Sequence, residues 1–369
     1  MRGFLLMLAL LLSACEAQPP ANGPAVRVDQ AMGAQPDPGF ARAYQPRAFE
    51  FPQDYAAHPG YATEWWYLTG NLQSESGRRF GYQVTLFRVG LRPGEPAPDS
   101  AWRANQIYMG HIAISDIDGG RHVSAERFAR AAAGLAGATP APFAVWLDDW
   151  SLRGGAGLFP LTVAAQNEDM ALSLQLTAGN KPLVLQGDHG LSRKSATPGN
   201  ASYYYSFTRL PTRGELRIGD QRYSVQGDSW MDREWSSSAL DKDQAGWDWF
   251  ALQLDDGREL MFYRLRNKQG GMHPFSRGSL VEKDGRVHSL LPGQVKLTPL
   301  NYWQAKDGTR YPVGWRLQVP GYGLDLEVQA LLDDQLMDHS VHYWEGAVAV
   351  SGSQDGRGYL ELSGYADRP

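Results

Sequence analysis

The residues best suited to chemistry gather between positions 228 and 249, where carboxylates lie close to indole side chains. Three acidic residues, Asp232, Glu234 and Asp248, stand in this stretch. Their neighbours include four tryptophans: Trp230, Trp235, Trp247 and Trp249. An apolar pocket keeps a carboxylic acid protonated near neutral pH, and aromatic faces stabilise a cation. The stretch therefore predicts acid chemistry, in which a carboxyl group gives its proton to an apolar molecule.

The spacing of these residues favours one shared cavity if the segment is a strand. Side chains alternate between the two faces of a strand, so Trp230, Asp232 and Glu234 would share a face. Tyr263 is a further candidate, because its hydroxyl could position the acid or a water molecule. The alternative interpretation is structural, with the carboxylates capping turns or pairing with arginines.

Two other polar residues have similar alternatives. Glu64 precedes a pair of tryptophans and could lie at a cavity mouth, but a buried charge needs a partner, and Arg88 is the candidate. His111 falls in an alternating segment, where a histidine of the core or of a cavity wall is the expected role. His339 and His342 would lie on opposite faces of a strand, so we predict no metal site.

The elements that must position these residues read as strands. Apolar and polar residues alternate over 80–87, 170–177 and 324–329, the period of a half-buried strand. Turn dipeptides typical of hairpins separate such segments at Gly219-Asp220, Asp256-Gly257 and Asp284-Gly285. The best helical candidate is 124–133, with Ser124 as its N-cap. We therefore expect an all-β fold of barrels or sandwiches.

The N-terminal residues predict export. Arg2 precedes an apolar segment at 4–12 and the sequence Leu-Ser-Ala-Cys ends at Cys15, as in a lipoprotein signal peptide. We expect cleavage after residue 14 and lipidation of Cys15. Residues 15–45, rich in Ala, Pro, Gln and Gly, are predicted to be a flexible tether. The expected location is the periplasmic side of a bacterial membrane.

Composition excludes several classes. The net charge is −5 with no basic stripe, which argues against nucleic-acid binding. Cys15 is the single cysteine, so no disulfide or thiolate metal site is expected. The sequence has no G-x-S-x-G elbow, phosphate-binding loop or dinucleotide motif, so we predict neither a serine hydrolase nor a cofactor. The 12 Trp, 17 Tyr and 13 Phe residues instead favour a site for an apolar ligand.

Several segments, taken in order, resemble the AttH/CrtC family of lipocalin-like proteins, which includes carotenoid 1,2-hydratase. The resemblance spans about residues 45–367 and is carried by these motifs: Glu64-Trp65-Trp66-Tyr67, Phe80-Gly81-Tyr82-Gln83, Gly110-His111-Ile112-Ala113, Gly227-Asp228-Ser229-Trp230-Met231-Asp232-Arg233-Glu234-Trp235, Gly246-Trp247-Asp248-Trp249, Tyr343-Trp344-Glu345-Gly346 and Gly358-Tyr359-Leu360-Glu361. It implies two lipocalin-like domains packed together, which we place at 46–236 and 237–369. It also implies association with an ABC exporter of the FtsX/LolC type.

Within these motifs we expect the ligand to contact eight side chains: Trp65, Trp66, Tyr67, Gln83, His111, Trp230, Trp235 and Trp249. Two functions remain open. The first is an envelope lipoprotein that binds an isoprenoid, polyene or lipid-like molecule at or between the domains. The second is a hydro-lyase like carotenoid hydratase, with Asp232, Glu234, Asp248 and Tyr263 as candidate catalytic residues. An acid would protonate an isoprenoid double bond and water would capture the cation.

Overall fold

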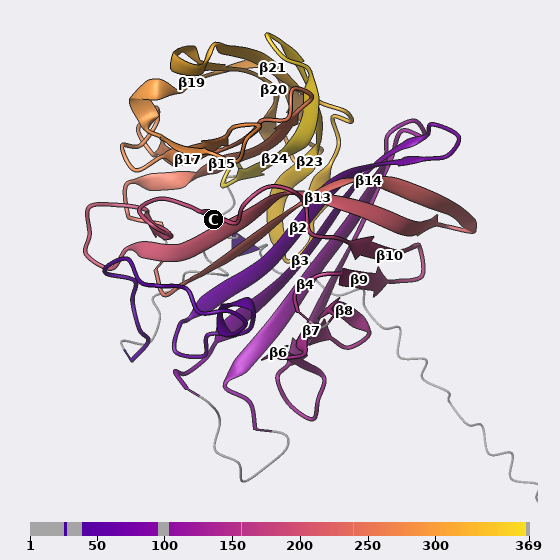
Figure 1. Cartoon of the computed structure of the whole chain (residues 1–369), viewed down its shortest axis with the longest axis vertical. Coiled ribbons are helices and arrows are strands. Elements are labelled where there is room, and N and C mark those ends of the chain that lie inside the picture. The colour runs from indigo at the N-terminus through magenta and orange to yellow at the C-terminus, as the bar shows by residue number, and fades with distance from the viewer. Residues whose placement is uncertain (1–25, 28–38, 95–102, 156, 239, 367–369) are drawn as a thin grey trace, which may run out of the picture.

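A computed structural model describes residues 26–27, 39–94, 103–155, 157–238 and 240–366. The fold is all-β, as the alternating patterns predict, with one half-barrel sheet and one nearly closed barrel-like sheet (Figure 1). The only helical elements among the described residues are three short 3-10 turns, η1 (Gln53–Tyr55), η2 (Pro292–Gln294) and η3 (Pro320–Tyr322). No helix in these ranges is both long and apolar enough to cross a membrane.

The first sheet is formed by the N-terminal half of the chain. Its strands pair in the order β5-β4-β3-β2-β14-β13-β10-β9-β8-β7-β6, with β11 and β12 also paired to β13. Their bounds are β2 (Thr63–Ser74), β3 (Arg79–Gly90), β4 (Gln106–Asp116), β5 (Arg121–Arg130), β6 (Ala136–Pro140), β7 (Phe143–Leu147), β8 (Trp150–Gly154), β9 (Leu161–Gln166), β10 (Met170–Leu176), β11 (Val184–Leu185), β12 (Leu191–Arg193), β13 (Ala201–Ile218) and β14 (Gln221–Ser236).

The second sheet is formed by the C-terminal half together with the short strand β1 from the N-terminal part of the chain. Its order is β18-β17-β16-β15-β24-β23-β21-β20-β19, and β1 and β22 pair with β23. The bounds are β1 (Val26–Arg27), β15 (Gln244–Leu254), β16 (Glu259–Asn267), β17 (Arg277–Val281), β18 (Val287–Leu290), β19 (Lys296–Gln304), β20 (Arg310–Val319), β21 (Leu324–Ala330), β22 (Leu336–Asp338), β23 (Val341–Gly352) and β24 (Gly356–Ser363).

The three turn dipeptides lie where the hairpin motif predicts them. Gly219-Asp220 joins β13 to β14, Asp256-Gly257 falls between β15 and β16, and Asp284-Gly285 falls between β17 and β18. In each hairpin the residues with positive φ are glycines, at 58°, 86° and 89° for Gly219, Gly257 and Gly285. A glycine takes this conformation without the steric cost that a side chain imposes.

Two expectations about local structure need correction. The predicted helix at 124–133 is wrong, because residues 121–130 form β5, paired along its length with β4. Pairing with a neighbouring strand outweighs the helix propensity of its alanines. The folded part also begins before residue 46, since Phe40 and Ala43 are already buried. The predicted signal peptide and Cys15 lie outside the described residues.

Three of the five clusters of buried side chains in the described residues show how the two sheets are built and joined. One lies within the first sheet and includes Trp66 and Trp150, and one lies within the second sheet and includes Trp315 and Trp344. The third joins the two sheets through aromatic side chains of both: Tyr67, Tyr204, Trp230, Trp249, Tyr263 and Tyr359. The aromatic residues that can meet a ligand are therefore at the contact between the two halves.

The two sheets approach each other closely at Gly81 of β3. A Cβ atom added there would lie 2.7 Å from Cβ of Ala347 in β23 and 2.8 Å from the hydroxyl of Tyr359 in β24. A side chain at this position would therefore push the sheets apart. The glycine of the Phe-Gly-Tyr-Gln motif thus sets the spacing of the walls that surround the site.

Candidate functional site

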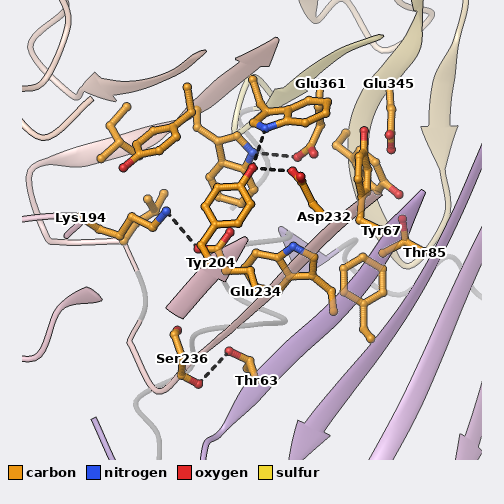
Figure 2. A pocket seen from close by; sticks show the side chains of 18 of the residues that line it. Thr63, Tyr67, Thr85, Lys194, Tyr204, Asp232, Glu234, Ser236, Glu345 and Glu361 are labelled. Carbon is orange, nitrogen blue, oxygen red and sulfur yellow. Dashed lines mark hydrogen bonds and ion pairs between the residues drawn. The ribbon is translucent and has the colours of Figure 1, made fainter. Parts of the chain in front are cut away.

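A cavity of about 140 Å³ lies between the two sheets. Its walls come from β2, β3, β13 and β14 of the first sheet and from β15, β16, β23 and β24 of the second (Figure 2). Most of its lining is aromatic or aliphatic: Trp65, Tyr67, Phe87, Tyr204, Leu240, Trp247, Trp249, Tyr263, Leu265 and Tyr343. A cavity of roughly 10–15 Å³ accommodates one water molecule, so this space holds on the order of ten waters or part of an apolar ligand.

Alternation along β14 brings two predicted carboxylates into this cavity. Asp232, Glu234 and Ser236 line it, while the intervening Arg233 and Trp235 point to the opposite face. The same alternation in β2 directs Trp65 and Tyr67 into the cavity. In β14 and β2, the alternation of side chains between the two faces therefore separates the residues of the cavity from those of the core.

Asp232 is the acid of the first sheet whose pKa is raised. Its Oδ1 accepts hydrogen bonds from Ser206 Oγ at 2.6 Å and from Trp230 Nε1 at 2.6 Å, and its Oδ2 accepts one from the Tyr204 hydroxyl. Burial raises the pKa of Asp232 from 3.8 to about 7, and the three donors only partly offset this effect. The side chain is thus a carboxylic acid that holds its proton up to neutral pH, as desolvation of a carboxylate requires.

The second sheet adds a pair of carboxyl groups. Glu345 of β23 and Glu361 of β24 are cross-strand partners, and both line the cavity. Trp247 Nε1 donates to Glu361 Oε1 at 2.7 Å. Burial raises the pKa of Glu361 to about 7, with the charges of Asp232 and Glu234 acting in the same direction.

Glu345 is the more strongly shifted member of the pair. Burial, followed by repulsion from Glu361, raises its pKa well above the usual value. The hydroxyl groups of Tyr67 and Tyr343 lower the pKa. Among the described residues, however, neither carboxyl oxygen of Glu345 has a partner at hydrogen-bond geometry. Glu345 is therefore an acid of raised pKa that faces the cavity, with two tyrosine hydroxyls near it but neither at hydrogen-bond geometry.

Glu234 differs from the other three carboxyl groups because it has a counter-ion. Lys194 Nζ lies 3.0 Å from its Oε1, and Ser202 Oγ also donates to it. Burial lowers the pKa of Lys194, but the attraction of Glu234 and then of Tyr263 outweighs burial and leaves this pKa raised. The Lys194 ammonium also lies 4.3 Å from the ring centre of Tyr263. This ion pair gives the cavity one charged side.

Of the candidate catalytic residues, Asp232, Glu234 and Tyr263 are brought together and Asp248 is not. Asp248 projects from the opposite face of β15 to Trp247 and Trp249. There it accepts hydrogen bonds from Arg264 Nε at 2.5 Å, Arg266 Nη1 at 2.6 Å and the Tyr365 hydroxyl at 2.7 Å. Asp248 is therefore paired with arginines, which is the structural role that the sequence left open as an alternative.

Trp66 and Trp235 lie away from the cavity, since each is on the opposite face of its strand from the lining residues. Trp66 Nε1 donates to the carbonyl of Tyr55 at 2.8 Å. Trp235 stacks on the ring of His58 with a centroid distance of 3.9 Å. Both tryptophans therefore have packing partners and belong to the core.

Three further expected ligand contacts lie just behind the lining. Trp230 holds Asp232 by the hydrogen bond described above. The amide of Gln83 donates to Thr85, which lines the cavity, at 2.5 Å. His111 is fully buried, with Nδ1 2.7 Å from the Tyr343 hydroxyl and Nε2 2.9 Å from Glu126 Oε1. These three side chains are placed to support lining residues.

The polar lining residues that sequence reasoning did not select include Lys194, Tyr204, Glu345 and Glu361. A signal existed for the two glutamates, because both fall inside motifs that carry the family resemblance. Alternation within a strand cannot show which strands of another sheet will face it. The pairing of Glu345 with Glu361 therefore had to come from the structure.

Glu64 belongs to a separate buried network. Its carboxylate contacts the guanidinium groups of Arg88 and Arg233, and all three side chains are fully buried. Burial alone would raise the pKa of Glu64, but Arg88 and then Arg233 hold it well below its usual value. The expectation of a buried glutamate paired with Arg88 is confirmed, and the second arginine is new.

These features define a class of protein: two lipocalin-like β-domains with an aromatic cavity between them. The sequence profile of the AttH-like family matches residues 42–365. The chain belongs to the AttH-like family, as the motifs suggest. A search of curated proteins gives no match.

Solved structures share this fold. A protein from Nitrosomonas europaea, described as a putative AttH, is 34% identical, with a TM-score of 0.78 over 89% of this chain and 100% of that one. Kievitone hydratase from Nectria haematococca is 13% identical, with a TM-score of 0.65 over 89% and 97% of the two chains. CghA is 16% identical, with a TM-score of 0.54 over 93% and 98%.

Proposed function

We propose that this protein binds an apolar isoprenoid, polyene or lipid-like molecule in the cavity and adds water to one of its carbon–carbon double bonds. One observation carries the proposal: Asp232 is a buried acid with a pKa of about 7, and it faces an aromatic cavity. A plain binding site for an apolar molecule gains nothing from such an acid. Protonating an unactivated double bond requires one.

The hydrogen bonds of Asp232 place its proton. Both acceptor positions of Oδ1 are used by Ser206 and Trp230, so the acidic proton belongs on Oδ2, beside the Tyr204 hydroxyl. That hydroxyl in turn accepts a hydrogen bond from Trp249 Nε1 at 3.1 Å. The chain of contacts fixes the orientation of the carboxyl group, as general acid catalysis requires.

In the proposed reaction the Oδ2 proton moves to one carbon of the double bond and the electron pair of that bond forms the new C–H bond. The other carbon becomes a carbocation. Water adds its oxygen to this carbon, and the resulting oxonium group returns one proton to the Asp232 carboxylate. The product is an alcohol, the acid is restored, and no other reactant is consumed. The rings of Trp65, Tyr67 and Trp249 line the space where the positive charge forms, and aromatic faces stabilise it.

The comparison proteins support a hydratase through their fold and the name of one of them. Kievitone hydratase is named for the addition of water, and the family that the motifs resemble includes carotenoid hydratase. At 13% identity the likeness to kievitone hydratase is one of fold. The argument for chemistry therefore depends on Asp232 and its surroundings.

The test is hydration itself. The purified protein is incubated in isotopically labelled water with acyclic carotenoids of the lycopene type and with shorter molecules that end in an isoprenyl group. We expect a product heavier by one labelled water, and none with Asp232→Asn. Asp228→Asn is the matched control, because Asp228 lies in the same strand but outside the cavity lining and should leave turnover intact.

Failure of every alkene to gain water would remove the reaction and leave a carrier. A carrier predicts that native mass spectrometry of protein purified from its own membranes shows a bound lipid-like molecule. Protein that is always empty would remove that function as well.

We also propose that the protein is a lipoprotein of the bacterial envelope, anchored through Cys15 on the periplasmic side and associated with an ABC exporter. The support is the signal-like sequence at 1–14 and the family resemblance. A Cys15→Ser variant should lose membrane attachment and remain able to bind ligand. Equal membrane attachment of both forms would refute the anchor.

A further inference from the structure

Unsatisfied polar atoms gather on one wall of the cavity. Among the described residues, both carboxyl oxygens of Glu345 and the hydroxyl oxygen of Tyr67 are buried and have no partner at hydrogen-bond geometry, although Tyr67 lies close enough to Glu345 for its hydroxyl to lower the pKa of that carboxyl group. Glu345 is 2% exposed and Tyr67 is 5% exposed. Buried polar groups nearly always have partners, because leaving one without a partner is costly. Three such atoms on neighbouring side chains therefore point to an occupant.

These atoms face open space and not a packed core. Glu345 and Tyr67 both line the cavity, and Figure 2 shows them on one side of it, across from Lys194. Glu361, the cross-strand partner of Glu345, extends the same wall. The wall therefore combines residues of β2 with residues of β23 and β24, and a guest in the cavity can reach it.

The charge state of this wall selects the occupant. A protonated carboxyl group offers one O–H donor and one carbonyl acceptor, and a phenol likewise donates and accepts. An uncharged hydroxyl oxygen, which also donates and accepts, is complementary to both groups. An anion would lack a counter-charge at this wall, because Lys194 lies across the cavity and is paired with Glu234 (Figure 2). A cation would favour ionised carboxylates, whereas burial favours the neutral form of Glu345.

We infer that Glu345, Tyr67 and Glu361 form a subsite for an uncharged hydroxyl oxygen: a water molecule in the empty protein and an alcohol hydroxyl in the complex. The inference deepens the proposed function and rests on it in one respect only, that the held water is the one that adds to the double bond. Water held in the same cavity as the acid would explain how an apolar cavity keeps its second reactant.

Binding of saturated probes tests the subsite without any reaction. Tetrahydrogeraniol has a hydroxyl group and no double bond, and its parent hydrocarbon lacks only that hydroxyl. Their affinities are measured by quenching of tryptophan fluorescence, since Trp65, Trp247 and Trp249 line the cavity. We expect the alcohol to bind at least about tenfold more tightly than the hydrocarbon, the effect of one well-placed hydrogen bond to a buried group.

Variants at Glu345 separate hydrogen bonding from shape. Glu345→Leu should abolish the preference for the alcohol while the hydrocarbon still binds. Glu345→Gln, which keeps one donor and one acceptor, should retain the preference. Tyr67→Phe removes a single hydroxyl group and provides the test if the leucine variant does not fold; it should reduce the preference severalfold.

Crystals of the empty protein and of the tetrahydrogeraniol complex distinguish the two occupants. We expect an ordered water within hydrogen-bond distance of Glu345 in the first and the probe's hydroxyl in its place in the second. The inference is overturned if alcohol and hydrocarbon bind equally, if the preference survives both Glu345→Leu and Tyr67→Phe, or if the corresponding primary amine binds more tightly than the alcohol. A preserved alcohol preference without any hydration would refute the proposed reaction and leave the subsite standing.

Discussion

Replacing Asp232 by asparagine should inactivate the protein and at the same time stabilise it at neutral and alkaline pH. Asparagine has the shape of the protonated acid. Its carbonyl oxygen can accept the hydrogen bonds that Ser206 and Trp230 donate at 2.6 Å each. Its amide group takes the position of Oδ2 beside Tyr204. The variant therefore keeps the two hydrogen bonds of Oδ1, while the one with Tyr204 must reverse so that the amide donates to the hydroxyl oxygen, and it lacks the proton that the proposed reaction needs.

The size of the effect follows from the shift of the pKa. Burial raises the pKa of Asp232 from 3.8 to about 7. Each tenfold change in proton affinity is worth about 1.4 kcal/mol, so the shift corresponds to about 4 kcal/mol. Because the folded pKa is the higher one, this stability is present at low pH, falls as the pH rises above 3.8 and is fully lost above about 7. The asparagine variant has no such loss.

Unfolding in urea at two pH values measures the difference, with tryptophan fluorescence as the signal. Between about pH 5 and about pH 8 the free energy of unfolding of Asp232→Asn should rise relative to the wild type by roughly 3 kcal/mol. Other titrating groups act in both proteins and cancel in the subtraction. The Asp228→Asn control should show a flat difference. A flat difference for Asp232→Asn itself would mean that Asp232 is already charged in the folded protein, and the acid mechanism would fail.

Three further predictions follow from the same structure. The rate of hydration should fall as the pH rises through about 7, where Asp232 and Glu361 lose their protons, and initial rates across this range would contradict the assignment if they rose instead. Glu64→Gln should lower the free energy of unfolding by about 3–5 kcal/mol, because two buried arginines lose their counter-charge; a loss below about 1 kcal/mol in urea unfolding would show that the network is not stabilising. Trp65→Ala should weaken ligand binding, whereas Trp66→Ala should cost about 3–5 kcal/mol of stability through the cavity it leaves in the core. Ligand titration and urea unfolding of both variants measure the two effects. The placement of Trp65 in the cavity and of Trp66 in the core would be refuted if the effects were exchanged.

Period-two alternation predicted much of the structure because it reports which face of a strand is buried. It correctly places Asp232 and Glu234 on one face of β14, and the turn dipeptides mark three hairpins. It could not rank the tryptophans, because a ring in the core and a ring in a cavity wall have the same residue type. Trp66 differs from Trp65 only in being the next residue of β2, and Trp235 alternates in the same way with Glu234 of β14.

The second carboxyl pair was beyond the reach of the sequence for a different reason. Glu345 and Glu361 face Asp232 only because the second sheet docks on the first, and this long-range contact leaves no local pattern. The incorrect helix at 124–133 has a related cause. Its alanines favour a helix locally, but β4 offers a strand partner along the full length of β5. Local preference yields when tertiary pairing is available.

Neither half of the chain forms the acid site by itself. Ser206, Tyr204 and Trp230, which hold Asp232, come from the first sheet, while Trp249, Glu345 and Glu361 come from the second. Until the C-terminal strands arrive, water has access to Asp232 and the residue behaves as an ordinary surface aspartate. A chain that is still being synthesised therefore lacks the buried environment that raises the pKa of Asp232. The pKa of Asp232 rises only when both sheets have folded and packed together.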